Sequence, residues 1–388
     1  MICNERNSGV RVLVLSSDPW INRLHGASIL SFWCELHKYV KTEVYIAFEQ
    51  YGKTYSLPPG NIVRMLTVKN LPLVDFISLS IRFLDTLIRI KPSIVICDPA
   101  TFLPSTIYKL LFRDRVRLVL LILSRPVLTS SIRGKLSVVI FKLSLTLARY
   151  FAEKITAISP FEAENYARLG RLPRNKLIVL PSPVDPIFIK TKCEELDKKE
   201  LRKNIGLEKF LDKIIILYYG VINKERGIID LVSTFFKIKA DNVILLIIGD
   251  GPDRKLLEGY VKSSDNVLVL PPIPYKNIPK LLCAVDIGIL PLPNVEDWRY
   301  QTPTKLVEML TIGLPVITTN LQGVKWVLRE YNCKFLIEKL DEKSLSEAIY
   351  SILRMKDSVV CKRSFDYSSS SIAKRFLVEI FNTLRETK

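Results

Sequence analysis

The residues best suited to chemistry are Thr304, Lys305 and Glu308, which lie within two turns of one predicted helix. Backbone N–H groups that open a helix, together with the positive end of its dipole, suit a phosphate. Thr304 and Glu308 are four residues apart, so they share a helix face about 5–6 Å apart along the axis. The carboxylate has two acceptor oxygens and can bind the cis-diol of a ribose. A phosphate followed by a ribose describes a nucleotide.

The same charged pair also allows a simpler interpretation, a solvated ion pair on an ordinary helix between two strands. The expected ends of the helix are clear in the sequence. Thr302 is a favourable N-cap, Pro303 suits the first helical position, and Gly313 suits a left-handed residue past the helix end. Residues 316–319 then read as a buried strand. The choice between a nucleotide site and a solvated ion pair therefore depends on the sequence on both sides of the helix.

Short aliphatic runs alternate with helical patterns along the whole chain, which predicts parallel sheets covered by helices. A first series of β-like runs occupies residues 10–16, 44–47, 94–97, 118–123, 154–159 and 176–180. A second series occupies residues 214–219, 243–248, 267–270, 287–290, 316–319 and 335–337. The predicted fold class is α/β, with two Rossmann-like, doubly wound parallel-sheet domains that face a central cleft, where ligands of such folds bind.

The two series define the expected domains. We predict a first domain over residues 1–187 and a charged, helical linker over residues 188–212. A second domain follows over residues 213–369, and a C-terminal helix over residues 370–388 is expected to pack back toward the first domain. A chain of 388 residues is long enough for two cores.

Composition indicates a globular enzyme of the cytosol. No apolar run approaches the roughly 18 residues needed to cross a bilayer, and the N-terminus lacks a secretory hydrophobic segment. The seven cysteines are scattered and never form a Cys-x-x-Cys pair, so we expect reduced thiols rather than a disulfide framework or a zinc site. With only two histidines and no acidic triad, we expect no metal site.

The positive charge is concentrated in the first half of the chain. The net charge is +18, and residues 1–185, with 25 basic and 13 acidic side chains, supply +12 of it. Within the predicted helix 131–150, Lys135, Lys142 and Arg149 are seven residues apart and form one stripe. This helix is either a buried one with a narrow basic edge or one that lies against an anionic membrane surface. The charge by itself would also fit a nucleic-acid partner.

In combination, these segments resemble a retaining nucleotide-sugar glycosyltransferase of the GT-B fold, family 4 type. The resemblance covers nearly the full chain and is strongest over residues 154–340. It rests on segments in a fixed order: AIS at 157–159, LPSPVD at 180–185, YGVINKERG at 219–227, IIGDGP at 247–252, VDIGILPLP at 285–293 and PTKLVEMLTIGLPVI at 303–317.

The resemblance assigns roles to individual residues. It implies that Glu308 binds the donor ribose and that Arg226 binds the donor diphosphate, with Lys224 as a nearby cation. Lys305 and the backbone N–H groups at the helix start are implied to bind the distal phosphate, and Gly220 belongs to the diphosphate-binding loop. Gly26 corresponds to the glycine loop of the first domain that closes over the diphosphate.

The implied reaction transfers a sugar from a nucleoside diphosphate sugar to a hydroxyl of a glycan or lipid-linked acceptor, with retention of the anomeric configuration. Arg226, Lys305 and Glu308 are the expected catalytic set, and the positive charges would stabilise the leaving diphosphate without a metal or a further cofactor. Peripheral contact with an anionic membrane, at its cytoplasmic face, is the expected partner interaction beyond the two substrates.

Two departures from the family pattern keep other functions open. Tyr300 stands where many members have a first glutamate, and Ser124 stands where many have a histidine. A nucleotide-sugar epimerase of the same fold and a degenerate, non-catalytic sugar-nucleotide-binding protein are the alternatives. A nucleic-acid-binding role is disfavoured, because the basic residues are not interleaved with stacking aromatics.

Overall fold

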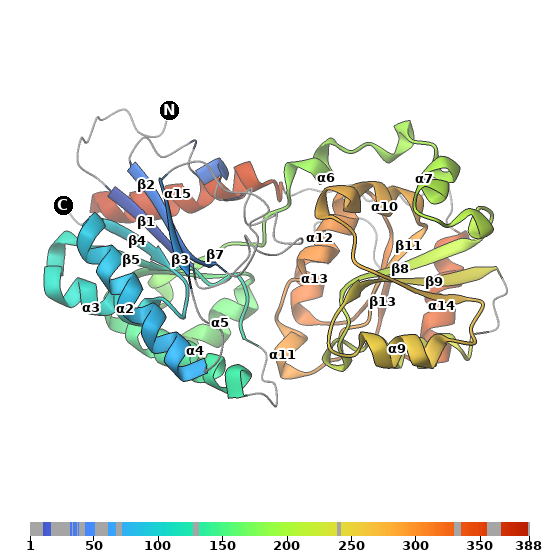
Figure 1. Ribbon diagram of the computed structural model, residues 1–388, viewed down its shortest axis with the longest axis horizontal. Helices are drawn as coiled ribbons and strands as arrows, with labels where there is room; N and C mark the ends of the chain where they lie inside the picture. The colour runs from blue at the N-terminus through green and yellow to red at the C-terminus, as the bar shows by residue number, and fades with distance from the viewer. Residues whose placement is uncertain are drawn as a thin grey trace. The chain divides into compact units, whose positions relative to one another are not determined.

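The computed structural model describes residues 11–16, 32, 34–36, 38, 43–50, 61–66, 72–126, 132–238, 242–329, 335–354 and 366–386. Contacts divide the chain into two compact units. The first comprises Met1–Asp185 with Tyr367–Lys388, and the second comprises Pro186–Asp366. Each unit contains one parallel sheet covered by helices, so the predicted α/β class with two Rossmann-like domains is confirmed (Figure 1).

The first unit contains a seven-stranded parallel sheet in the order β3-β2-β1-β4-β5-β6-β7. The central strand β4 is a continuous aliphatic run that is buried along its whole length, as expected where helices cover both faces of a sheet. The strands are β1 Arg11–Ser16, β2 Glu43–Gln50, β3 Asn61–Leu66, β4 Ile94–Cys97, β5 Arg117–Leu120, β6 Ala152–Ala157 and β7 Leu177–Val179.

Four helices of the first unit lie on one face of its sheet, because each joins strands that advance in the same direction and such crossovers are right-handed. They are α2 Pro72–Ile90, α3 Phe102–Phe112, α4 Ile132–Phe151 and α5 Pro160–Gly170. Helix α15, Ser369–Glu386, lies on the other side of the sheet (Figure 1). It joins the first unit through a contact of the Phe32 and Phe376 rings, whose centroids are 5.7 Å apart, and through a bridge between Val184 and Ser368.

The second unit contains a six-stranded parallel sheet in the order β10-β9-β8-β11-β12-β13. The strands are β8 Ile214–Val221, β9 Val243–Asp250, β10 Val267–Leu270, β11 Ile287–Leu290, β12 Val316–Thr319 and β13 Phe335–Ile337. The helices are α6 Pro186–Lys190, α7 Lys198–Asn204, α8 Ile228–Phe235, α9 Arg254–Val261, α10 Ile278–Ala284, α11 Glu296–Arg299, α12 Thr304–Thr311, α13 Gln322–Leu328 and α14 Glu342–Arg354. Short 3₁₀ turns connect several of them, including η6 Lys224–Arg226 and η7 Tyr275–Asn277.

The segment expected to be a linker, residues 188–212, is instead part of the second unit. The guanidinium of Arg202, on α7, is only 3% exposed and donates to the backbone oxygen of Ala284 at 2.9 Å and to the carboxylate of Asp286 at 2.7 Å. It also donates to three backbone oxygens just before β8. A buried cation with this many acceptors fixes the segment to the sheet. The segment is charged and helical, as the sequence indicated, but its contacts place it in the second unit.

The expectation of reduced thiols is also wrong for one pair. Cys193 and Cys283, which are 90 positions apart in the chain, form a disulfide with their Cα atoms 5.1 Å apart. The bond links the segment before α7 to α10. Among the described cysteines, Cys34 and Cys97 are free thiols. Because disulfides are rare in reducing compartments, the cysteines no longer support the cytosolic expectation.

Candidate functional site

Helix α12 begins with unsatisfied backbone donors at the edge where the strands of the second sheet end. The helix starts at Thr304, with Pro303 as its N-cap, one residue later than predicted. Proline offers no side-chain acceptor, and no side chain of the described residues caps the helix. The hydroxyl of Thr302, the predicted cap, is buried and has no hydrogen-bond partner in the described part of the chain. The first N–H groups of α12, from Thr304 and Lys305, are therefore free to bind an anion. At the other end Gly313 has φ +88°, as the sequence predicted.

The carboxylate of Glu308 lies one turn into α12 and is held by two tyrosines. The Glu308 side chain is buried, with 3% of its surface exposed. Tyr219, at the end of β8, donates its hydroxyl to one carboxylate oxygen at 2.6 Å, and Tyr275, in η7, donates to the other at 2.6 Å. A carboxylate has about four acceptor sites, so its two oxygens can accept from more than one donor each.

Burial and the adjacent Glu308 charge raise the pKa of Tyr219 well above its usual value, so this residue remains a donor.

Lys305 extends from α12 to the glycine at the end of β8. Gly220 has φ +136°, and a Cβ atom at this position would lie 2.2 Å from the Lys305 ammonium nitrogen. The same nitrogen is 5.7 Å from the centre of the Tyr219 ring. Gly220 is thus favoured by its backbone conformation, and the end of the Lys305 side chain lies where a side chain at this position would begin. This pairing brings together two of the predicted site residues.

Arg226 is positioned by a tight loop after β8. Gly227 has φ +72°, and a Cβ there would lie 2.1 Å from the backbone oxygen of Pro291, so only glycine fits. The guanidinium lies 4.8 Å from the centre of the Trp298 ring, and the Trp298 indole N–H donates to the backbone oxygen of Glu225 at 2.7 Å. The Nε atom of Arg226 is buried and has no acceptor within the described residues. An unpaired cationic donor of this kind suits an anionic ligand.

The electrostatics of the site show an excess of positive charge. Burial, with repulsion from Arg226, lowers the pKa of the half-buried Lys305 to about 8, although Glu308 opposes the shift. Partial desolvation disfavours the ammonium form of Lys305 as long as no negative charge is bound next to it. An anion bound between Lys305 and Arg226 would supply it.

Not every predicted site residue joins this cluster. Lys224 is exposed, and its backbone N–H donates to the Asp253 carboxylate at 2.7 Å. No contact within the described residues links its side chain to Glu308 or Lys305. Gly26 lies outside the described residues.

Three aromatic residues of the site, Tyr219, Tyr275 and Trp298, were not predicted. Tyr219 directly precedes the predicted Gly220, whereas nothing in the sequence singles out the other two.

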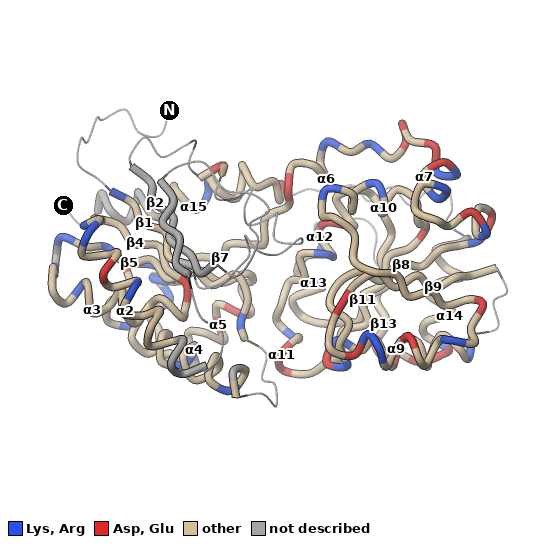
Figure 2. The backbone as a smooth tube through the Cα atoms, in the orientation of Figure 1, with Lys and Arg blue, Asp and Glu red and all other residues tan. Residues whose placement is uncertain are grey.

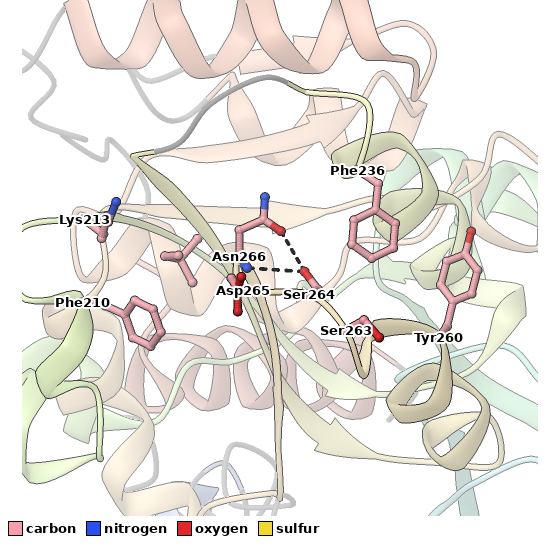
Figure 3. Close-up of a pocket in the computed structure, with 9 residues that line it drawn as sticks. Phe210, Lys213, Phe236, Tyr260, Ser263, Ser264, Asp265 and Asn266 are labelled. Atoms are coloured by element: carbon pink, nitrogen blue, oxygen red, sulfur yellow. Dashed lines mark hydrogen bonds between the residues drawn. The ribbon is translucent and has the colours of Figure 1, made fainter.

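A hollow among the described residues lies at the opposite edge of the same sheet. It has a volume of about 670 Å³ and lies where β8, β9 and β10 begin. Figure 3 shows Phe210 and Lys213 on one side, Phe236 and Tyr260 on the other, and Asn266 between them. We base the candidate site on chemistry rather than on volume, because the uncapped helix, the buried carboxylate and the two cations converge at the strand ends.

In sequence, this chain is similar to known glycosyltransferases. Residues 197–363 match the family described as Glycosyl transferases group 1. A Bacillus subtilis protein named as the teichuronic acid biosynthesis glycosyltransferase TuaC is 29% identical over 179 residues, which cover 45% of this chain and 42% of that protein. The capsular polysaccharide biosynthesis glycosyltransferase CapM of Staphylococcus aureus is 25% identical over 295 residues, covering 69% of this chain and 73% of CapM. The match to TuaC thus spans less than half of that relative's length.

Solved structures support the fold. Anabaena HepE, in a complex with UDP and glucose, aligns with a TM-score of 0.71 at 15% identity, and the alignment covers 97% of this chain and 99% of HepE. At that identity the likeness establishes the architecture alone, two Rossmann-like domains of the GT-B kind.

Proposed function

We propose that this chain, a member of the glycosyl transferases group 1 family through its residues 197–363, transfers a sugar from a nucleoside diphosphate sugar to a hydroxyl group. One observation carries the proposal. The buried carboxylate of Glu308 lies one turn below the uncapped start of α12, next to Lys305 and Arg226. A nucleoside diphosphate needs this combination, a diol acceptor followed by cationic and N–H donors.

In this proposal, the donor ribose binds to Glu308. Its two hydroxyls would donate to the two carboxylate oxygens, each of which also accepts a hydrogen bond from one tyrosine. The two tyrosines fix the carboxylate plane before the ligand arrives, so little ordering of side chains is needed on binding.

The diphosphate in turn would bind the N–H groups of Thr304 and Lys305, the Lys305 ammonium and the Arg226 guanidinium. These groups would stabilise the negative charge that grows on the leaving diphosphate, which is the main catalytic task.

We further propose that the reaction retains the anomeric configuration and needs no metal ion. Retention in this family is usually explained by attack on the same face as the leaving group, whose phosphate accepts the proton of the acceptor hydroxyl. That role requires no side-chain base, and two cations already face the diphosphate. Activity that survives chelation with EDTA, and a product of unchanged anomeric configuration by NMR, are the expected results. Loss of activity that Mg²⁺ or Mn²⁺ restores would refute metal independence.

For the acceptor, we propose a hydroxyl of a glycan or a lipid-linked saccharide, with the reaction on the cytoplasmic side of the membrane. The names of TuaC and CapM place those relatives in polysaccharide synthesis, which supports a glycan acceptor. Among the described residues, no helix is both long enough and apolar enough to cross a bilayer.

Nucleoside diphosphate binding to Glu308→Gln tests the donor site. UDP is the first ligand to try, because HepE binds it, followed by the other nucleoside diphosphates. We expect one of them to raise the Tm of the wild type. The glutamine variant should bind it about 10- to 100-fold more weakly, because hydrogen bonds to a charged group are worth roughly 1.5–3 kcal/mol. Glu258→Gln, on α9 and paired with Arg254 at 2.8 Å, is the matched control and should bind normally.

The alternatives give different results in the same experiments. If no nucleotide binds at millimolar concentration, the donor site is refuted. Binding without sugar transfer to any tested glycan or lipid-linked acceptor would favour a degenerate protein, and isomerisation of the sugar nucleotide without an acceptor would favour an epimerase.

A further inference from the structure

The three helices α2, α3 and α4 form one layer whose outer surface carries large aliphatic side chains. The helices pack side by side on the same face of the first sheet. On α2, Ile77, Ile81 and Ile88 are exposed, with Ile81 at 64%. Their spacing of four and eleven residues places them on one helix face, opposite the buried Leu79 and Phe83.

Helix α3 continues this surface. Ile107, Leu110 and Leu111 are exposed, with Leu111 at 62%, whereas Phe102 and Tyr108 are buried. The helix contains no acidic residue.

Helix α4 repeats the arrangement and adds the basic stripe that the sequence indicated. Ile132, Val139 and Leu143 are exposed, with Ile132 at 77%, and lie opposite the buried Phe141 and Leu145. Aliphatic residues therefore lie on the outer face of three successive helices, which is more than the scattered exposure of an ordinary surface.

Exposed basic side chains flank the aliphatic residues on α2 and α4. Lys135, Lys142 and Arg149 are exposed on α4, which has no acidic residue. Arg82 and Arg89 are exposed on α2, and the charge of Asp85 is compensated by Arg89 at 2.9 Å. The described Lys and Arg positions of these helices are blue in Figure 2. Long basic side chains beside apolar ones are typical of surfaces that lie in the headgroup region, where the chains extend toward phosphate.

We infer that the outer surface of α2, α3 and α4 binds an anionic membrane surface, with the aliphatic residues inserted between the lipids and the basic residues against the headgroups. Charge argues against a second copy of this chain as the occupant. A two-fold dimer through this surface would place the same basic stripe against itself, which is repulsive. An anionic bilayer complements it, and each basic residue near such a surface strengthens binding by about fivefold.

The experiment is co-sedimentation of the full chain with vesicles. One set contains phosphatidylcholine with 30% phosphatidylglycerol, and the other contains phosphatidylcholine alone. The apolar variant combines Ile81→Ser, Leu111→Ser and Val139→Ser, and the charge variant combines Lys135→Glu with Lys142→Glu. All five side chains are exposed in the wild type, so the fold should survive, and circular dichroism and Tm check this. Leu256→Ser, on α9 of the second unit and 63% exposed, is the matched control.

We expect the wild type and Leu256→Ser to bind the anionic vesicles equally, and both combined variants to bind at least tenfold more weakly. Binding at 500 mM NaCl should fall for the wild type but change little for the charge variant. Absence of wild-type binding, or equal binding by the apolar variant, would overturn the inference. So would a dimer in light scattering that the apolar variant breaks, since the surface would then bind a second copy. Nucleoside diphosphate binding, measured on the same samples, reports separately on the proposed function.

Discussion

Replacing Lys305 by arginine should change how nucleotide affinity depends on pH. The Lys305 pKa of about 8, against an ordinary value of 10.5, means that the ligand-free protein loses this proton between about pH 7 and 9. A bound diphosphate favours the ammonium form and returns the pKa toward its ordinary value. Affinity for the diphosphate should therefore fall as pH rises through 8, because an increasing share of the free protein must first take up a proton.

The magnitude follows from the same pKa. With a free-state value of 8 and a bound-state value above 10, the Kd should rise about eightfold between pH 7.5 and pH 9. At pH 8.5, binding should take up about 0.8 proton per site. Arginine stays protonated throughout this range, so Lys305→Arg should show a flat Kd and no proton uptake. The nucleotide itself is almost fully ionised above pH 7.5 and adds little to the slope.

Isothermal titration calorimetry in buffers of different ionisation enthalpy measures both quantities on one sample. Two results would refute the conclusion that Lys305 takes up the proton on binding. One is a wild-type Kd that is constant from pH 7.5 to 9, and the other is a Kd of Lys305→Arg that rises with pH as in the wild type. Lys305→Met keeps a long side chain but removes the charge, so we expect this variant to bind the nucleoside diphosphate weakly at every pH.

The stability of the ligand-free protein gives an independent check. Between pH 8 and 10.5 the unfolded chain holds this proton more tightly than the folded one, so the free energy of unfolding should rise with pH in this window. Below pH 8 the charged, partly desolvated ammonium costs on the order of 3 kcal/mol. Lys305→Met should be more stable than the wild type at pH 7, with a difference that narrows by pH 10.

Other substitutions test the packing that supports the site. A Cβ at Gly249 would lie 1.8 Å from the Gly220 backbone oxygen, so Gly249→Ala should lower the free energy of unfolding by about 3 kcal/mol or more in a urea titration. Gly259→Ala, with open space around it on α9, should instead raise it by about 0.5–1 kcal/mol; equal effects would contradict the packing argument. Cys193→Ser removes the crosslink to Cys283 and should lower the free energy of unfolding by ~4–5 kcal/mol under oxidising conditions, but should not change it in the presence of reductant. A thiol titration that finds both cysteines free in the native protein would exclude the disulfide.

Much of the fold could be predicted because it depends on local sequence. The strands β4, β10, β11, β12 and β13 have the bounds that their aliphatic runs predicted, because a short run of adjacent apolar residues is a local signal for a strand in a helix-covered sheet. Strand β3, Asn61–Leu66, was not predicted, because arginine interrupts its apolar run. The sequence predicted that α12 begins at Pro303, whereas it begins one residue later, at Thr304. Helix ends predicted from capping residues are usually uncertain by one or two positions.

The sequence by itself determined which residues of the candidate site carry charge and which helix presents them. Glu308 and Lys305 lie on one helix, and local rules of helix starts and side-chain spacing relate them without any tertiary contact.

Only the tertiary structure decided what surrounds these charges. Tyr219 is 89 residues from Glu308 and Tyr275 is 33 residues from it, and both meet the carboxylate only because parallel strands bring their ends to one edge of the sheet. The same folding places the Lys305 ammonium against Gly220 and lowers its pKa. Desolvation and charge repulsion depend on distance in space, and a sequence specifies only distance along the chain.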